Sequence, residues 1–219
     1  MGVKAIVTGA TGMVGEGVLH ECLRHPEIEK VLIINRKPSG KSHPKLTEII
    51  HEDFFDLAKV RERLAGFDAC FFCLGVSSIG MNEASYHRLT YDLTLNFART
   101  LLDLNPGMTF CYVSGSGTDS TENGKSMWAR VKGKTENHLL ALGFEDAYMF
   151  RPGFMHPTPG LKNTLKFYRY INWMYPFLRK VFPKYISTLS ELGLAMIHAV
   201  TKGYNKPVLE VKDIVQLAK

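Results

Sequence analysis

Long apolar runs, a cysteine framework and a leader pattern are missing from this 219-residue sequence. No apolar stretch approaches the roughly 18 residues that a membrane-spanning helix needs. Four cysteines are too few and too scattered for a disulfide scaffold. The first residues, MGVKAIVTGATG, enter a strand-like pattern at once, without signal-peptide architecture. We therefore expect a soluble, intracellular protein, located in the cytoplasm.

Acidic residues are missing from one long stretch. None occurs between Asp146 and Glu191, where seven Lys and Arg side chains stand. The whole chain has a formal net charge of +6, so the rest of the chain is nearly neutral. Because 45% of the residues are hydrophobic, a disordered chain is excluded, and the positive charge is a local feature of a folded protein.

Two of the cysteines form a CxxC pair, Cys70 and Cys73, within the apolar run DACFFCLG. This run predicts a buried strand, along which successive side chains point to opposite faces. A spacing of three therefore sends the two thiols to opposite sides of a sheet. We expect small buried hydrophobic residues and no metal site.

Short β-like runs alternate with longer helical stretches, a pattern typical of a parallel sheet covered by helices. The helices are expected around 14–22, 83–104, 125–142 and 189–200. The sequence therefore predicts an α/β fold with a doubly wound parallel sheet, forming one domain over 1–219. Its strands are expected at 3–9, 30–35, 46–51, 68–75, 108–115 and 146–153, with a candidate seventh at 207–211.

A glycine-rich turn, TGATGMVGEG, directly follows the first predicted strand and opens the first predicted helix. Its glycines, Gly9, Gly12 and Gly15, allow close approach of the backbone to a phosphate, and the helix N-terminus then offers free N–H groups. The alternative is a tight turn with a purely structural role. In this context we predict a dinucleotide site of the Rossmann type, whose turn residues also include Thr11, Met13 and Val14.

The end of the second strand bears on the kind of dinucleotide. An NAD site usually has an Asp or Glu there, whereas a 2′-phosphate calls for basic groups. Here Asn35, Arg36 and Lys37 follow, with no carboxylate. An ordinary solvated basic loop is the alternative. We favour NADP(H) over NAD(H), because a guanidinium can hold the phosphate in a charge-assisted pair.

The ends of the third and fourth strands should border the same crevice, because ligands of doubly wound sheets bind at the carboxyl ends of strands. Asp53 is suited to accept from the adenine amino group, with Phe54 beside the ring. Alternatively, Asp53 caps a helix that begins near Asp56. The cofactor candidates at these two ends are Asp53, Phe54, Leu74, Gly75 and Val76.

Several of these segments together resemble a known superfamily. TGATGMVG, the CLG after the fourth strand, Ser114 after the fifth, VKGKTE, and the RPG at 151–153 are similar to atypical short-chain dehydrogenase/reductases of the NAD-dependent epimerase/dehydratase type. Within that superfamily, the chain resembles the Tat-interacting-protein-like group of NADP(H)-binding proteins. The resemblance implies a Rossmann fold and adds Pro152, Gly153 and Lys132 to the cofactor contacts.

The same resemblance implies a catalytic trio of Ser, Tyr and Lys, in which Tyr transfers the proton that accompanies hydride transfer. Ser114 and Lys132 are present, but Trp128 occupies the tyrosine position, in MWARVKGK. An indole N–H donates hydrogen bonds and does not titrate. The proton must then come from Ser114, from ordered water or from His156. Two hypotheses stay open: an NADP(H)-dependent oxidoreductase or epimerase, and a catalytically silent NADP(H) sensor.

A basic aromatic segment, FYRYINWMYPFLRKVFPKY at 167–185, lies within the acid-free stretch. We predict that residues 154–185 form a small C-terminal cap over a small-molecule substrate of apolar or anionic character. A homodimer interface and an amphipathic membrane contact are the alternatives, and the membrane contact is not favoured. Nucleic-acid binding is not expected, because the sequence contains no recognisable reading module.

Overall fold

The fold is built around one seven-stranded parallel sheet in the order β3-β2-β1-β4-β5-β6-β9. The computed structural model describes residues 2–163, 175–182 and 184–219. Each ladder of the sheet is parallel, and the strand order reverses beside β1, which confirms the predicted doubly wound α/β fold. The strands are β1 (Val3–Thr8), β2 (Ile28–Asn35), β3 (Leu46–Ile50), β4 (Ala69–Phe72), β5 (Thr109–Val113), β6 (Asp146–Arg151) and β9 (Val208–Glu210).

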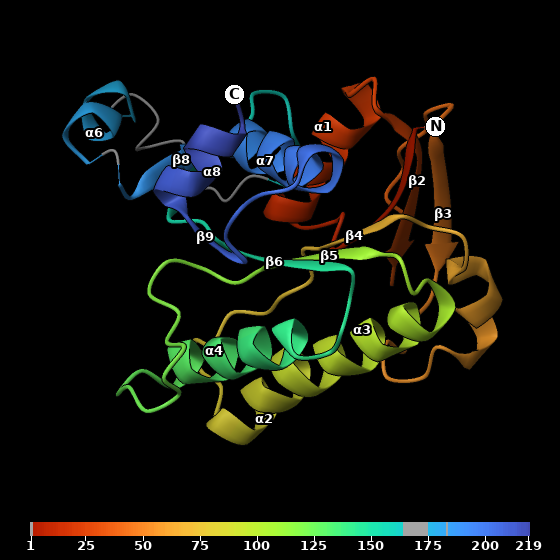
Figure 1. The fold of residues 1–219 in the computed structure, drawn as a ribbon, viewed down its shortest axis with the longest axis horizontal. Coiled ribbons are helices and arrows are strands. Elements are labelled where there is room, and N and C mark those ends of the chain that lie inside the picture. Colours follow the sequence, from red (N-terminus) through yellow and green to blue (C-terminus); the bar gives the residue numbers. More distant parts are fainter. Residues whose placement is uncertain (1, 164–174, 183) are drawn as a thin grey trace.

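Helices cover the sheet on both faces (Figure 1). One layer holds α1 (Met13–Arg24), α7 (Leu189–Lys202) and α8 (Val211–Leu217), and the other holds α2 (Glu83–His87), α3 (Leu93–Leu104) and α4 (Met127–Leu140). A π-helical turn, Arg88–Asp92, joins α2 to α3 without a break, so the helix predicted over 83–104 is present. A 3₁₀ turn, Ala58–Leu64, follows β3.

The sheet separates two hydrophobic cores, as alternation along its strands requires. In β4, Phe71 packs into the core under α1 and α7, whereas Cys70 and Phe72 pack into the core under α3 and α4. Cys73 contacts the first core, so the CxxC thiols lie on opposite faces as predicted. Burial raises the pKa of the Cys70 thiol well above its usual range.

A second, two-stranded parallel sheet pairs β7 (Phe154–His156) with β8 (Ile186–Thr188). The short helix α6 (Tyr175–Val181) stands between these strands in the sequence and at the outer end of the molecule (Figure 1). Three-residue strands are too short to give a readable hydrophobic period, and the sequence did not predict them. The predicted cap segment, 154–185, is therefore described only in part: residues 164–174 and 183, with much of the aromatic run, lie outside the described residues.

The part of the chain that the structure describes contains no helix long and apolar enough to cross a membrane. Within those same residues, no group of three or more His, Cys, Asp or Glu side chains is arranged to hold a metal ion.

Candidate functional site

The glycine-rich turn closes tightly between β1 and α1. Gly9 has a φ of +68°, and the Gly12 amide donates to the Gly9 carbonyl oxygen at 2.9 Å. A Cβ on Gly15 would stand 2.2 Å from that same oxygen, so this position accepts only glycine. No side chain caps Gly12, the N-cap of α1, which leaves the first amides of the helix for an anion. The turn therefore has the geometry of a diphosphate cradle.

The turn is tied to the end of β4 through a side chain that the sequence did not single out. Thr8 Oγ1 accepts from the amides of Cys73 and Leu74, both at 3.1 Å. Thr8 is fully buried. This contact holds the Leu74–Val76 segment beside the glycine-rich turn, as the topological switch point requires.

A hollow of about 180 Å³ opens at the carboxyl ends of β2, β3 and β4. It brings together residues that the sequence assigned to the adenosine end of a dinucleotide, although the Phe54 ring itself is buried and stacks on Phe97 with 6.0 Å between centroids. The hollow is lined by Arg36, Glu52, Asp53, Phe54, Phe55, Leu74, Gly75, Val76, Leu89 and Leu93.

At these strand ends, one cofactor candidate is not placed as expected, and one alternative for another candidate is wrong. Asn35 is buried and donates from Nδ2 to Glu48 at 2.9 Å, so it shapes the loop after β2 and does not line the hollow. Asp53 caps no helix: its carboxylate accepts the Phe55 amide at 2.8 Å, while Asp56 accepts the Ala58 amide at the 3₁₀ turn. Asp53 is thus available to a ligand, and the capping alternative is wrong.

A second hollow, of about 270 Å³, lies on the other side of the turn, between Thr11, Ser39, Lys41 and Lys162. Its floor is Glu16, which is 1% exposed and accepts from Lys41 Nζ at 2.9 Å and from the Asn163 amide at 2.8 Å. Burial raises the pKa of Glu16, but these hydrogen bonds outweigh burial, and the net pKa is lowered. Sequence reasoning missed Glu16; its signal was an acid inside the glycine motif, in the first turn of the helix.

The predicted catalytic residues meet at the end of β5. Ser114 follows β5, and its backbone carbonyl oxygen accepts from the Lys132 ammonium. Trp128 lies one turn before Lys132 on α4, with its indole beside Gly117 of the loop after β5. Burial lowers the pKa of Lys132 to about 8, against a smaller opposing effect of the nearby Glu136 carboxylate. The structure thus brings Ser114, Lys132 and Trp128 to one place.

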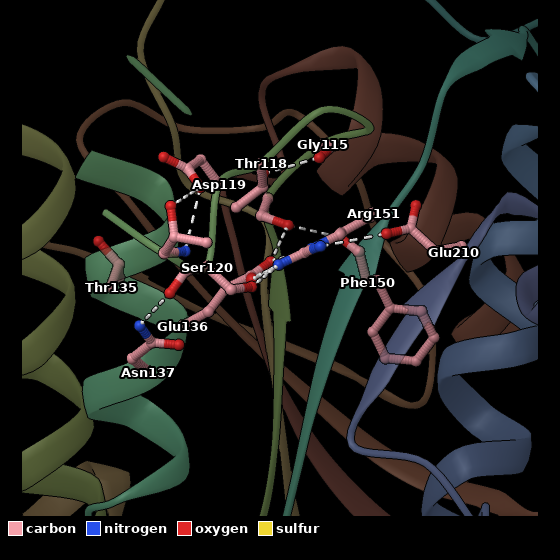
Figure 2. Close-up of polar contacts among 12 residues, drawn as sticks. Gly115, Thr118, Asp119, Ser120, Thr135, Glu136, Asn137, Phe150, Arg151 and Glu210 are labelled. Carbon is pink, nitrogen blue, oxygen red and sulfur yellow. Dashed lines mark hydrogen bonds and ion pairs between the residues drawn. The ribbon is translucent and has the colours of Figure 1, made fainter. Parts of the chain in front are cut away.

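Next to these residues lies a buried network of ion pairs that the sequence did not predict (Figure 2). Arg151 at the end of β6 points between α4 and β9. Its Nε donates to both carboxylate oxygens of Glu136 at 3.1 Å, its Nη1 to Glu210 at 3.1 Å, and its Nη2 to Ser120 at 2.5 Å. Burial lowers the pKa of Arg151, but the pairing with Glu136 and Glu210 outweighs it and raises the pKa overall. The RPG and VKGKTE segments were the available signal.

Gly153 and His156 lie further along, toward the cap. A hollow of about 530 Å³, lined mostly by apolar groups, is bordered by Ser116, Gly153, Phe154, Phe182, Tyr185 and Ile186. Pro152 accepts the Ser116 amide at 2.8 Å, so this hollow adjoins the loop after Ser114. His156 in β7 stacks on Tyr175 at 4.0 Å, and burial lowers its pKa.

Residues 5–121, just over half of the chain, match the model of the NAD dependent epimerase/dehydratase family. The chain belongs to this family. It is 30% identical over 159 residues to the "Protein fmp52-1, mitochondrial" of Aspergillus terreus, covering 68% of this chain and 66% of that protein. It is 27% identical over 155 residues to "Protein FMP52, mitochondrial" of Eremothecium gossypii, covering 70% and 66%. The match thus spans slightly less than two thirds of these relatives' own lengths.

Several solved structures share the fold. A UDP-N-acetylglucosamine 4-epimerase from Methanobrevibacter ruminantium superposes with a TM-score of 0.67 at 17% identity, covering 98% of this chain and 80% of that one. A short-chain dehydrogenase from Burkholderia cenocepacia, solved with NADP, gives 0.67 at 17%, covering 98% and 92%. The Bordetella bronchiseptica enzyme WbmF, solved with NAD⁺, gives 0.66 at 15%, covering 99% and 76%. The family binds nicotinamide dinucleotides, and both kinds occur on this fold.

The expected cytoplasmic location is wrong. The Fmp52 relatives from three fungi are named mitochondrial proteins, which contradicts that expectation. The prediction rested on the lack of a secretory signal and of an apolar span, and neither feature reports on delivery to mitochondria.

Proposed function

We propose that this member of the epimerase/dehydratase family binds NADP(H) in preference to NAD(H) and acts on a small carbonyl or hydroxyl compound. The observation that carries the proposal is that the Ser114–Lys132 pair and the glycine-rich turn both lie at the carboxyl ends of the strands of one sheet. Lys132 and the turn would hold the dinucleotide, which supplies redox chemistry when bound. The chain's own residues orient the substrate and move its proton.

Preference for the 2′-phosphate rests on Arg36. Arg36 is exposed and lines the hollow at the carboxyl ends of β2, β3 and β4. It lies directly after β2, where an NAD-specific chain would have a carboxylate. The acids that share this hollow, Glu52 and Asp53, follow β3 instead. Arg36 is therefore placed to pair with a phosphate on the adenosine ribose.

Calorimetry with NADPH and NADH tests this assignment. We expect the wild type to bind NADPH more tightly, and Arg36→Ala to lose roughly tenfold or more of NADPH affinity while NADH affinity stays constant. Lys212→Ala is the control, because Lys212 is also exposed, lies on α8 and lines neither hollow beside the turn. Equal wild-type affinities for the two nucleotides would refute the preference, and binding of neither would refute the proposed function.

The cap segment 154–185 is proposed to cover an apolar or anionic small molecule. Its described part exposes Phe177, Phe182 and Tyr185 by half or more of their surface and borders the apolar hollow beside Ser116. A catalytically silent NADP(H) sensor is the second candidate function. It is favoured by one observation, the non-titrating indole of Trp128 one turn before Lys132.

A further inference from the structure

The hollow of about 530 Å³ beside Ser116 lies where the cap segment meets the loop after β5. Three segments of the chain form its walls: the loop after β5, the turn between β6 and β7, and the chain that leads from α6 into β8. Its volume lies within the range of pockets that hold small organic molecules. The hollow is therefore large enough for the body of a small substrate.

Backbone hydrogen bonds hold these walls together. The Ser116 amide donates to the Pro152 carbonyl oxygen at 2.8 Å. The Phe154 amide donates to the Tyr185 carbonyl oxygen, also at 2.8 Å. This close approach of Tyr185 depends on Gly153, because a Cβ there would stand 2.3 Å from the same Tyr185 oxygen. The hollow is thus built into the fold, and the amides of Ser116 and Phe154 are already paired within the protein.

The side chains around the hollow are mostly apolar. Phe154, Phe182 and Ile186 border it, and its polar side chains are the hydroxyl groups of Ser116 and Tyr185. Among the described residues, no charged side chain lines it. Phe182 and Tyr185 leave half or more of their surface exposed. An apolar ligand in the hollow would remove part of that surface from water, which is favourable.

The positive charges described in the acid-free stretch do not border this hollow. Arg179 on α6 donates to both carboxylate oxygens of Glu191. Arg151 belongs to the buried network of ion pairs (Figure 2). Lys180 and Lys184 are exposed and do not line the hollow. An anionic group bound there would lose its water without gaining a cationic partner, which is unfavourable.

We propose that this hollow binds the hydrocarbon part of an uncharged, apolar ketone or aldehyde. The inference rests on the proposed function and deepens it, because it selects the apolar substrate class over the anionic one. It also excludes sugar nucleotides, the class of ligand in the Methanobrevibacter ruminantium epimerase structure. Their diphosphate calls for guanidinium or ammonium partners, whereas Phe154, Phe182 and Ile186 supply two rings and an aliphatic group.

A series of methyl ketones tests the apolar class without requiring turnover. NMR titration of ¹⁵N-labelled protein with 2-butanone, 2-pentanone, 2-heptanone and 2-nonanone compares ligands that differ only in alkyl length. We expect the dissociation constant to fall roughly two- to fourfold for each added methylene, because each one leaves water for an apolar wall. The amides of Ser116, Phe154 and Ile186 should shift throughout the series. Equal dissociation constants, or shifts confined to other amides, would overturn the inference.

Two charged probes test the excluded classes. Octanoate has the same heptyl chain as 2-nonanone but ends in a carboxylate, and it should bind roughly tenfold or more weakly. UDP-N-acetylglucosamine should leave the amides of Ser116, Phe154 and Ile186 unshifted at concentrations where 2-nonanone saturates them. Octanoate that binds as tightly as 2-nonanone contradicts the inference, and so does a sugar nucleotide that shifts these amides.

A matched pair of variants tests the location of the site. Phe182 borders the hollow and is 50% exposed, so its replacement leaves the core intact. Phe182→Ser should weaken 2-nonanone binding roughly fivefold or more, because a ring is lost from the wall. Phe177→Ser removes the same ring from α6, where Phe177 is 65% exposed and does not line the hollow, and should bind like wild type. Equal losses in the two variants would assign the ketone to the aromatic surface of the cap and reject the hollow.

NADPH affinity, measured separately by calorimetry, distinguishes the inference from the proposed function. Protein that binds no nicotinamide dinucleotide refutes the proposed function, while the ketone series still decides which class of ligand the hollow takes. Protein that binds NADPH but shows no dependence on alkyl length overturns the inference alone.

Discussion

At the residue scale, the proposed site depends on Trp128, which the resemblance to short-chain dehydrogenase/reductases aligns with their tyrosine. Trp128 stands one helical turn before Lys132, the place where a tyrosine would share a helix face with the lysine. The lysine beside Ser114 remains, and burial holds its pKa near 8. The proposed site would thus keep the groups that hold a dinucleotide and would lack the usual proton donor.

Replacing Trp128 with tyrosine should add that donor. In Trp128→Tyr, the Lys132 ammonium would stabilise the tyrosinate and lower the pKa of the new hydroxyl. We expect NADPH-dependent reduction of simple carbonyl compounds to rise by roughly 10²- to 10⁴-fold, followed by loss of NADPH absorbance. Trp128→Phe, which keeps an aromatic ring and has no hydroxyl, is the control and should show no gain. Equal gains in both variants would mean that the size of the side chain, not its proton, limits the rate.

The substitution Gly15→Ala gives a second prediction at the residue scale. An added methyl group would stand 2.2 Å from the Gly9 carbonyl oxygen, a backbone atom that cannot move without opening the turn. Gly15→Ala should therefore lower NADPH affinity at least tenfold by calorimetry and lower the free energy of unfolding by about 1–3 kcal/mol. Gly107→Ala is matched to it, since its new methyl would meet only the Glu145 carboxylate, at 3.4 Å. Tight NADPH binding by Gly15→Ala would contradict the cradle.

At the element scale, the sequence predicts the seven strands of the main sheet and four of the helical regions, because each carries a short apolar run or a helical hydrophobic period. It does not predict β7 or β8, whose three residues span no full pattern, nor α8. The site divides in the same way. The glycines of the turn and the residues at strand ends can be predicted as site residues from their position in the sequence. The partners of Glu16 and Arg151 cannot, because they are up to 147 and 59 residues distant along the chain. Only the folded chain brings such pairs together.

Glu16 links α1 to two loops, and its removal should loosen both loops. Its carboxylate joins α1 to Lys41 of the loop after β2 and to the Lys162 and Asn163 amides inside the predicted cap segment. Glu16→Gln should speed hydrogen exchange at these two amides and lower the free energy of unfolding by about 1–3 kcal/mol at neutral pH.

The pH dependence of that loss has a definite sign. The folded-state pKa of Glu16 lies below its ordinary value of 4.5, so its stabilisation is present above about that pH and is lost as the pH falls through the lowered pKa. Urea unfolding of wild type and Glu16→Gln should therefore converge in acid. Glu29→Gln, at an exposed position on β2, should match wild type throughout. A difference between wild type and Glu16→Gln that persists unchanged below about pH 3 would show that packing, not charge, is responsible.

At the scale of the whole molecule, the sheet divides the interior into two hydrophobic cores that share strands but not side-chain faces. Ile197 on α7 belongs to one core and Ile49 on β3 to the other, and both are 1% exposed or less. Because substitutions that share no contacts act independently, their effects should add. Ile197→Val and Ile49→Val should each lower the free energy of unfolding by about 0.5–1.5 kcal/mol.

The double variant should lose the sum of the two effects within about 0.5 kcal/mol, measured by urea unfolding with one common slope. Ile197→Val combined with Leu192→Ala, which lies in the same core, supplies the contrast and is expected to deviate from the sum. A coupling of about 1 kcal/mol or more between Ile197 and Ile49 would mean that the sheet transmits strain from one layer to the other. The glycine-rich turn and the Ser114–Lys132 pair, which lie at the edge of the same sheet, would then respond to substitutions in either core.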